Sequence, residues 1–189
     1  MNQPGAQVHL VSMPWHGIGM APLALALVRG TLARSHPQLA VTEHFANILW
    51  AEYLLAESGG SVLPQHYHEV AETGLPLGLG DWIFAGVLYR DPTWRLSELT
   101  GFAGRYGYDI SSAVRMRALA EGFCQALADE IVAAEPQIVG FTTTFMQNVP
   151  SLALARLIKE RSPSTIVVFG GANCDGAMGA PVPGSARSA

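Results

Sequence analysis

The sequence predicts an α/β fold built on a doubly wound parallel sheet. The main evidence is the stretch 137–176, which has in succession the patterns of a strand, a polar loop, a helix, a strand and a glycine-rich loop. Its apolar runs 138–141 and 166–169 are too short for helices, and the second is β-branched and aromatic throughout, as in strands covered on both faces. The residues between them, 148–161, have helical spacing and end before Pro163. This is a βαβ unit, whose crossover should be right-handed.

The first half of the chain adds two more strands, each followed by a helix. Leu23, Leu27 and Gly30 share one face of the first helix, which must end before Pro37. The glycines at 59–60 stop the second helix. The expected elements are a strand at 8–11, a helix beginning at Pro22, a strand at 39–45 and a helix at 46–55.

Between the second and third strands we expect a packed helical insertion, over about residues 56–110. Glycines and prolines from Gly74 to Pro92 interrupt any long element there, yet residues 82–89 are too apolar for a free linker. We expect one or two short helices within it. A longer helix follows at 112–134, where apolar side chains repeat every four residues (Leu119, Phe123, Leu127 and Ile131).

The sequence provides four strands, one fewer than a five-stranded flavodoxin-like or Rossmann-like sheet. In a doubly wound sheet of this type the spatial order should be second, first, third, fourth, which leaves residues 165–169 at an edge. Residues 1–176 then form one α/β domain, and residues 177–189 have the composition of a disordered tail. We therefore expect a chain that is cut short relative to a longer fold.

Composition restricts the classes of function. Of the 189 residues, 49% are hydrophobic and only 14% are charged, so the chain can bury a sizeable core. A net charge of −4 argues against nucleic acid as a partner, because a phosphate backbone requires a basic surface. No secretory signal is visible, and the longest apolar run, Met20 to Val28, is broken by Pro22 and too short to span a membrane. We expect a soluble cytoplasmic protein.

Several short motifs, taken together and in this order, resemble one family. They are Ser12-Met-Pro-Trp15, Asn47 with Ala51-Glu52, Gly80-Asp-Trp-Ile-Phe84, Gly140-Phe-Thr-Thr-Thr-Phe145, Gln147-Asn148, Ser151-Leu-Ala-Leu-Ala155 and Gly170-Gly-Ala-Asn-Cys174. The family is the radical SAM proteins that mature ribosomally made peptides (RiPPs), peptide C-methyltransferases that begin with a cobalamin-binding domain. The resemblance covers roughly residues 8–179.

The resemblance implies that cobalamin is held at the carboxyl ends of the strands. The corrin would lie against the loops after the first and third strands, and the nucleotide tail would pass Gly170 and Gly171. Hydroxyl and amide side chains there can pair with the amides at the corrin's periphery, while the glycines allow a close approach. The implied cofactor-binding residues are Met13, Pro14, Trp15, Thr142, Thr143, Thr144, Phe145, Gln147, Asn148, Gly170, Gly171, Ala172 and Asn173.

The same resemblance implies radical methylation of a peptide carbon, with S-adenosylmethionine and an iron–sulfur cluster in a full-length relative. The cluster of that family is held by a Cys-x3-Cys-x2-Cys triplet, whereas this chain has only Cys124 and Cys174. We therefore assign no catalytic residue and no metal ligand, and we expect a domain that is inactive alone. Its expected partners are cobalamin, a radical SAM domain or a precursor peptide.

Two other functions stay open. Gly17 and Gly19, with Glu43 as a ribose partner, form a partial dinucleotide fingerprint, so a Rossmann-like nucleotide-binding module is the second hypothesis. The third is an α/β interaction domain without a small ligand. His16 lies in a Pro-x-His-x-x-Gly sequence that lacks the aspartate which orients a cobalt-ligating histidine, so we expect an ordinary loop histidine.

Several candidates also have plain structural interpretations. The His66-x-His68 pair with Glu69 and Glu72 could seed a zinc site, but a solvated helical face is the favoured interpretation. The three threonines could simply end a strand, Asn148 could cap its helix, and Cys174 could pack as a small hydrophobe. Trp15 and Phe145 could each either line the corrin or pack in the core.

Overall fold

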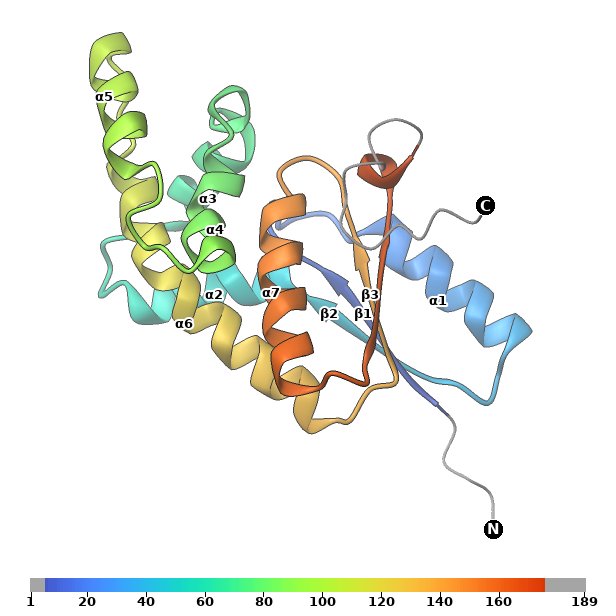
Figure 1. Ribbon diagram of the computed structural model, residues 1–189. Helices are drawn as coiled ribbons and strands as arrows, with labels where there is room; N and C mark the ends of the chain where they lie inside the picture. Colours follow the sequence, from blue (N-terminus) through green and yellow to red (C-terminus); the bar gives the residue numbers. More distant parts are fainter. Residues whose placement is uncertain (1–5, 176–189) are drawn as a thin grey trace.

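The computed structural model describes residues 6–175 and confirms the predicted fold class. Four strands form one parallel sheet in these residues, in the order β2-β1-β3-β4 (Figure 1), which is the order expected for a doubly wound sheet of the flavodoxin-like type. The strands are β1 (Gln7–Ser12), β2 (Ala40–Phe45), β3 (Ile138–Thr142) and β4 (Ile166–Gly170). The tail expected at 177–189 lies outside the described residues.

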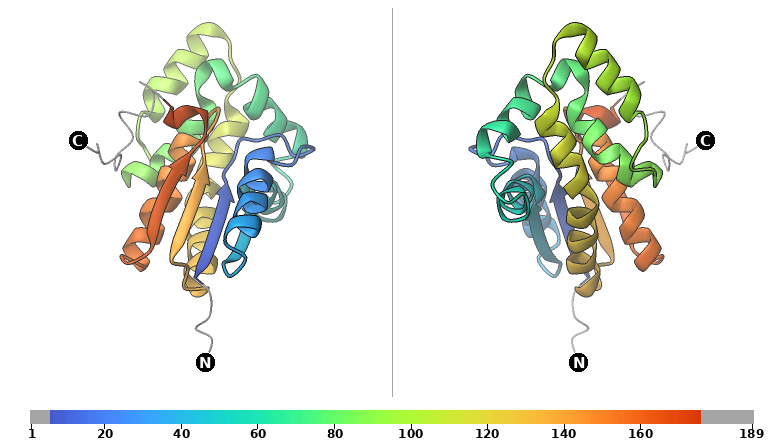
Figure 2. Two further views of the ribbon diagram at one scale, coloured as in Figure 1. Left: turned by 90° about the vertical axis from the view of Figure 1, so that its right-hand side faces the viewer. Right: turned by 90° about the vertical axis from the view of Figure 1, so that its left-hand side faces the viewer.

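Helices cover the two faces of the sheet unequally. Helix α1 lies on one face, and α2, α6 and α7 lie on the other (Figure 2). The helices of this framework are α1 (Leu23–Ser35), α2 (Ala46–Glu57), α6 (Ser111–Ala133) and α7 (Asn148–Arg161). All four begin and end close to the limits that periodicity and the proline and glycine signals predict.

The insertion between β2 and β3 contains more structure than the sequence predicts. Instead of one or two short helices it has three, together with a short 3₁₀ helix: α3 (Pro64–Glu72), η1 (Leu75–Leu77), α4 (Leu79–Tyr89) and α5 (Leu96–Tyr106). Helix α4 packs against both α6 and α7 and is apolar almost all round, with Ile83 and Phe84 wholly buried. Glycines and prolines in this segment therefore separate short helices that belong to the main core.

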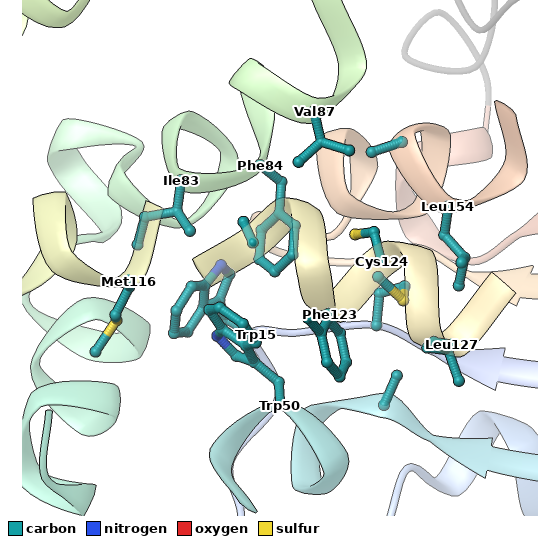
Figure 3. Close-up of a cluster of buried hydrophobic side chains, with 14 of the residues drawn as sticks. Trp15, Trp50, Ile83, Phe84, Val87, Met116, Phe123, Cys124, Leu127 and Leu154 are labelled. Carbon is teal, nitrogen blue, oxygen red and sulfur yellow. The ribbon is translucent and has the colours of Figure 1, made fainter. Parts of the chain in front are cut away.

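One large core joins the sheet to these helices. Val11, Val139 and Phe141 project from the sheet into it, and Trp50 and Phe123 meet them from α2 and α6. Figure 3 shows the aromatic centre of this core, where Trp50 lies beside Phe84 and Phe123 with ring centroids 5.2 and 4.9 Å apart. The core thus lies on one side of the sheet.

The opposite face is covered only in part, which corrects two expectations. On α1 the buried residue is Leu25, which packs on Val8 and Leu10, whereas Leu23 and Leu27 are exposed. Strand β4 is not covered on both faces: Ile166 and Val168 are 58% and 49% exposed. The reason is that α1 lies over β1 and β2, so the same face of β3 and β4 has no helix over it within residues 6–175 (Figure 2).

No helix in residues 6–175 is both long enough and apolar enough to cross a lipid bilayer.

Candidate functional site

The loops after β1, β3 and β4 meet at the carboxyl edge of the sheet, which is the edge where α/β proteins bind ligands (Figure 2). The strand ends are in register, with Ser12 beside Thr142 and Thr142 beside Gly170. The Thr143 backbone N–H then donates to the Gly170 carbonyl at 2.7 Å, and the Thr143 hydroxyl donates to the same oxygen at 3.0 Å. The sheet pairing therefore continues into the loops and holds them together.

Gln147 connects the loop after β3 to the loop after β1. Its Nε2 donates to the Met13 carbonyl at 2.6 Å, and its Oε1 accepts from the Thr144 backbone N–H at 3.0 Å and from the Thr144 hydroxyl at 2.9 Å. The side chain is wholly buried, so both ends of the amide are used inside the protein. Gln147 positions the two loops and has no exposed surface for a ligand.

The three candidates after β1 are also buried. Met13 and Pro14 have no substantial exposed surface, and the Trp15 ring lies inside the aromatic core, 5.0 Å from Tyr67 and 6.2 Å from Phe84 (Figure 3). Of the two interpretations of Trp15, the structure has the core one. Helix α4 causes this burial, because Gly80 lies so close to the indole that a Cβ there would be 2.2 Å from Trp15 Cδ1.

Phe145 has the opposite environment, although it too is an aromatic residue in a loop that follows a strand. Its side chain is 73% exposed, while its neighbour Met146 is buried against Gly80. Thr142 and Thr144 are half-buried at the base of this loop. An exposed aromatic ring in this loop can cover a flat apolar molecule, and threonine hydroxyl groups in the same loop can hydrogen-bond its polar substituents.

The glycine-rich loop after β4 packs against the loop after β3. Gly171 has a φ of 112°, and a Cβ on it would lie 2.4 Å from the Thr143 carbonyl oxygen, so only glycine fits there. Nδ2 of Asn173 donates to Oδ1 of Asn148 at 3.0 Å and also to the Thr144 carbonyl. Glycine is thus required at 171 by contact with Thr143, not by a ligand. At Gly170, by contrast, no atom lies within 4 Å of the place a Cβ would occupy.

The other side chains near this loop are either exposed to solvent or bonded to neighbouring segments. Ala172 is exposed, and the Cys174 thiol lies 3.2 Å from the Thr143 hydroxyl, so the cysteine makes a polar contact and belongs to neither apolar cluster of the described residues. Asn148 does not cap its own helix, because its side chain accepts from Asn173. The Val149 N–H of α7 is instead satisfied by Asp81 Oδ1 at 3.1 Å, and burial raises the pKa of that Asp81 carboxyl.

Two buried polar residues next to this edge were missing from the predicted site. Asn47, in the first turn of α2 directly after β2, is 0% exposed, and neither atom of its amide has a hydrogen-bond partner in the described part of the chain. Ser151, in the first turn of α7, is also buried with its hydroxyl unpaired. Unpaired buried polar groups are rare and costly. The sequence could have indicated both residues, because each is a polar residue within an otherwise apolar face of its helix.

The residues of the nucleotide hypothesis have other roles in the structure. Glu43 lies within β2, not at its end, and its carboxylate accepts from Arg29 of α1 at 2.5 Å. Gly17 and Gly19 do not have the positive φ that would require glycine. Because the carboxylate expected for ribose is already paired, this fingerprint lacks its most specific part.

The histidine candidates are dispersed. The His16 backbone carbonyl accepts from the Tyr67 hydroxyl at 2.7 Å, which fixes the loop after β1 to α3. His66 Nδ1 accepts from the Leu63 N–H at 3.0 Å at the start of α3, and His68 faces Glu72 one turn along the helix surface. Within residues 6–175, no three His, Cys, Asp or Glu side chains gather closely enough to hold a metal ion.

Comparisons with protein-family models, with curated proteins and with solved structures give no match for this chain. The fold and the edge define its class: an α/β protein whose strand-end loops contain an exposed aromatic ring, half-buried threonines and an open glycine.

Proposed function

We propose that this chain is a cobalamin-binding domain of the kind that accompanies a radical SAM domain in peptide C-methylation, and that it is not catalytic by itself. The observation that supports this most is the 73% exposure of Phe145 at the ligand edge of the sheet. When a flat apolar ligand covers a large apolar ring in this place, the apolar surface removed from water favours binding.

The other residues at the edge suit a large ligand with polar substituents. Thr142 and Thr144 keep part of their surface exposed. The Thr142 hydroxyl can donate to or accept from the amides at the rim of a corrin, and the Thr144 hydroxyl, which donates to Gln147, can still accept. The open space at Gly170 leaves room for a bulky group beside the end of β4. Met20, which is 65% exposed, is a second exposed apolar side chain in a loop that follows a strand, here β1.

The burial of each side chain indicates whether it would contact the cofactor or position the loops. Phe145, Thr142, Thr144, Gly170 and Ala172 would contact the cofactor, since their surfaces are accessible. Met13, Pro14, Trp15, Thr143 and Gln147 are buried and would act by holding the loops in position. When bound, cobalamin supplies a cobalt that can carry a methyl group, and the chain's own residues orient it and exclude water from its apolar faces. The peptide and the radical SAM chemistry belong to partners.

The proposal is tested by incubating the protein with hydroxocobalamin, separating free cofactor by gel filtration and recording the absorption spectrum. We expect the cofactor to elute with the protein, and Phe145→Ala to weaken binding about tenfold, as expected for the loss of one aromatic contact. Phe102→Ala is the matched control, because Phe102 is also an exposed phenylalanine but lies on α5. A parallel incubation with NAD tests the nucleotide hypothesis. If the protein binds NAD and does not bind cobalamin, the nucleotide hypothesis is favoured over the proposal.

Two further variants refine the site. Gly170→Val should weaken binding without loss of folding, because the position is open. Gly171→Val is unsuitable as a binding test, since it would clash with Thr143 whether or not a ligand is present. His16→Ala should leave the spectrum of the bound cofactor unchanged; loss of a nitrogen-ligated cobalt signal in that variant would show that His16 binds the metal.

A further inference from the structure

A second candidate site lies between α2, the start of α3 and the loop after β1. It is a pocket of about 230 Å³. Its inner wall consists of Leu54, Val62 and Tyr67, all of which are buried. Its rim consists of Ile18, Leu55 and Leu63, which are 40%, 49% and 40% exposed. An apolar pocket surrounded by exposed apolar side chains is the usual form of a site that recognises another molecule.

The walls of this pocket are fixed by hydrogen bonds. The turn from α2 to α3 is closed by Ser61, whose hydroxyl donates to the Ser58 carbonyl at 2.7 Å, and by Ser58 Oγ, which accepts from the Val62 N–H at 3.1 Å. Pro64 then begins α3. Because the turn is tied at both ends, the pocket does not need to be opened by its ligand.

Size and charge indicate the kind of ligand. A volume of about 230 Å³ is below the range of about 300–1,000 Å³ typical of sites for cofactors and drug-sized molecules, and suits one bulky side chain. Glu52 is the one charged residue that lines the pocket, and it forms no ion pair with any other described residue. The next acidic residue of α2, Glu57, is also exposed. The surface is therefore complementary to an apolar group that has a cation beside it.

We propose that this pocket binds a partner peptide through a leucine-sized side chain whose neighbour in the peptide is lysine or arginine. The apolar side chain enters between Leu54 and Tyr67, and the cation faces Glu52. The exposed rim extends the apolar contact beyond the pocket itself, which a peptide can cover and a small amine cannot. The inference does not depend on the cofactor that the sheet edge binds.

The pocket is also joined to the sheet edge. Tyr67 lines the pocket, donates its hydroxyl to the His16 carbonyl and packs its ring 5.0 Å from Trp15. Ile18, on the rim, belongs to the same loop. A peptide bound here would therefore contact the loop that follows β1, through Ile18.

The test is an NMR titration of the full chain, with labelled methyl groups, using N-acetyl-leucyl-lysine amide as the probe. We expect saturable shifts at the methyl groups of Leu55, Leu63 and Val62. N-acetyl-alanyl-lysine amide should bind at least about tenfold more weakly, because it loses the buried apolar side chain. N-acetyl-leucyl-glutamate amide should bind about threefold more weakly, because its charge repels Glu52 at an exposed site.

Variants with matched controls decide the location. Leu55→Ser should weaken the leucyl-lysine probe several-fold, and Leu27→Ser, an exposed leucine on α1, should not change it. Glu52→Gln should abolish the difference between the lysine and glutamate probes, and Glu57→Gln should preserve it. Absence of saturation up to about 20 mM, the range of the weakest specific contacts, would overturn the proposal. Equal binding of the alanyl and leucyl probes would overturn it too, and that comparison needs only the unmodified chain.

Discussion

Nε2 of His44 lies 2.9 Å from Nδ1 of His9, inside the protein, where β1 and β2 run side by side. Nδ1 of His44 lies 3.7 Å from the carboxylate of Glu130 on α6. The carboxylate favours a proton on that nitrogen, so Nε2 of His44 is left to accept from the Nδ1–H of His9. His9 Nε2 is buried without a partner among the described residues. The pair is therefore stable when both rings are neutral. An added proton on Nε2 of His44 would place two N–H groups face to face.

The histidine pair should make the protein sensitive to acid. Burial lowers the pKa of both rings, and for His9 the neighbouring His44 lowers it further while Glu130 opposes the shift. Unfolded histidines take up protons near pH 6.5, earlier than these folded ones. The free energy of unfolding should therefore be highest above about pH 6.5 and fall below it, by at most about 1.4 kcal/mol per pH unit for each extra proton. Urea unfolding at pH 8, 6.5 and 5.5 measures this.

Variants identify the source of that pH dependence. The double variant His9→Leu with His44→Leu should flatten the profile between pH 8 and 5.5, because it removes both groups together. Each single variant should lower stability at pH 8 by about 1–3 kcal/mol, since the remaining ring is buried without its partner. His68→Gln, on the exposed surface of α3, is the control. An unchanged profile in the double variant would show that other groups cause the acid sensitivity.

Gly80 should not tolerate even a methyl group. A Cβ there would lie 2.2 Å from Trp15 and 3.0 Å from the Cβ of Met146, so Gly80→Ala must push α4 away from the loop after β1. We expect a loss of stability of about 1–3 kcal/mol from overpacking, despite the better helix propensity of alanine. Gly101→Ala on α5 is the matched control, because a Cβ there meets nothing within 4 Å. It should stabilise by about 0.5–1 kcal/mol, as measured by thermal or urea unfolding.

Asn47 should show opposite effects on stability and on ligand binding. Its amide is fully buried and unpaired, so Asn47→Leu should raise the free energy of unfolding by about 1 kcal/mol or more. If the amide helps to form the ligand edge, the same variant should bind hydroxocobalamin more weakly. Ser151→Ala, which removes the other unpaired buried group, gives the comparison on α7. A loss of stability in Asn47→Leu would instead indicate that buried water satisfies the amide.

The β4 edge should cause self-association. Ile166 to Gly170 contains neither proline nor charge, and Ile166 and Val168 present an apolar surface beside a strand edge that pairs with no other strand within residues 6–175. Val168→Lys should therefore keep the protein monomeric at concentrations where the unmodified chain associates, as light scattering would show. Val167→Lys should unfold the protein instead, since this side chain packs against the main core. A monomer with slow amide exchange over 166–170 at high concentration would show that the edge is already covered.

The sequence by itself determined the framework of this protein. Periodicity is local, so the runs at 138–141 and 166–169 and the helix between them could be located from their own residues. The strand order followed too, because a doubly wound parallel sheet of the flavodoxin-like type places the first strand between the second and the third. Prediction failed for properties that depend on distant segments. The exposure of one face of β4 depends on whether another element lies over it, and the strand's own residues do not encode this.

The tertiary structure alone decided which edge residues face solvent. Trp15 and Phe145 have the same local signature, an aromatic residue in a polar loop after a buried strand. Trp15 is buried because Gly80, 65 positions further along the chain, brings α4 against its ring, whereas no described element lies over Phe145. The same holds for Gly171, which must be glycine because of Thr143 on another strand's loop. Contacts between distant segments fix the burial of a loop side chain, and a single sequence does not reveal those contacts.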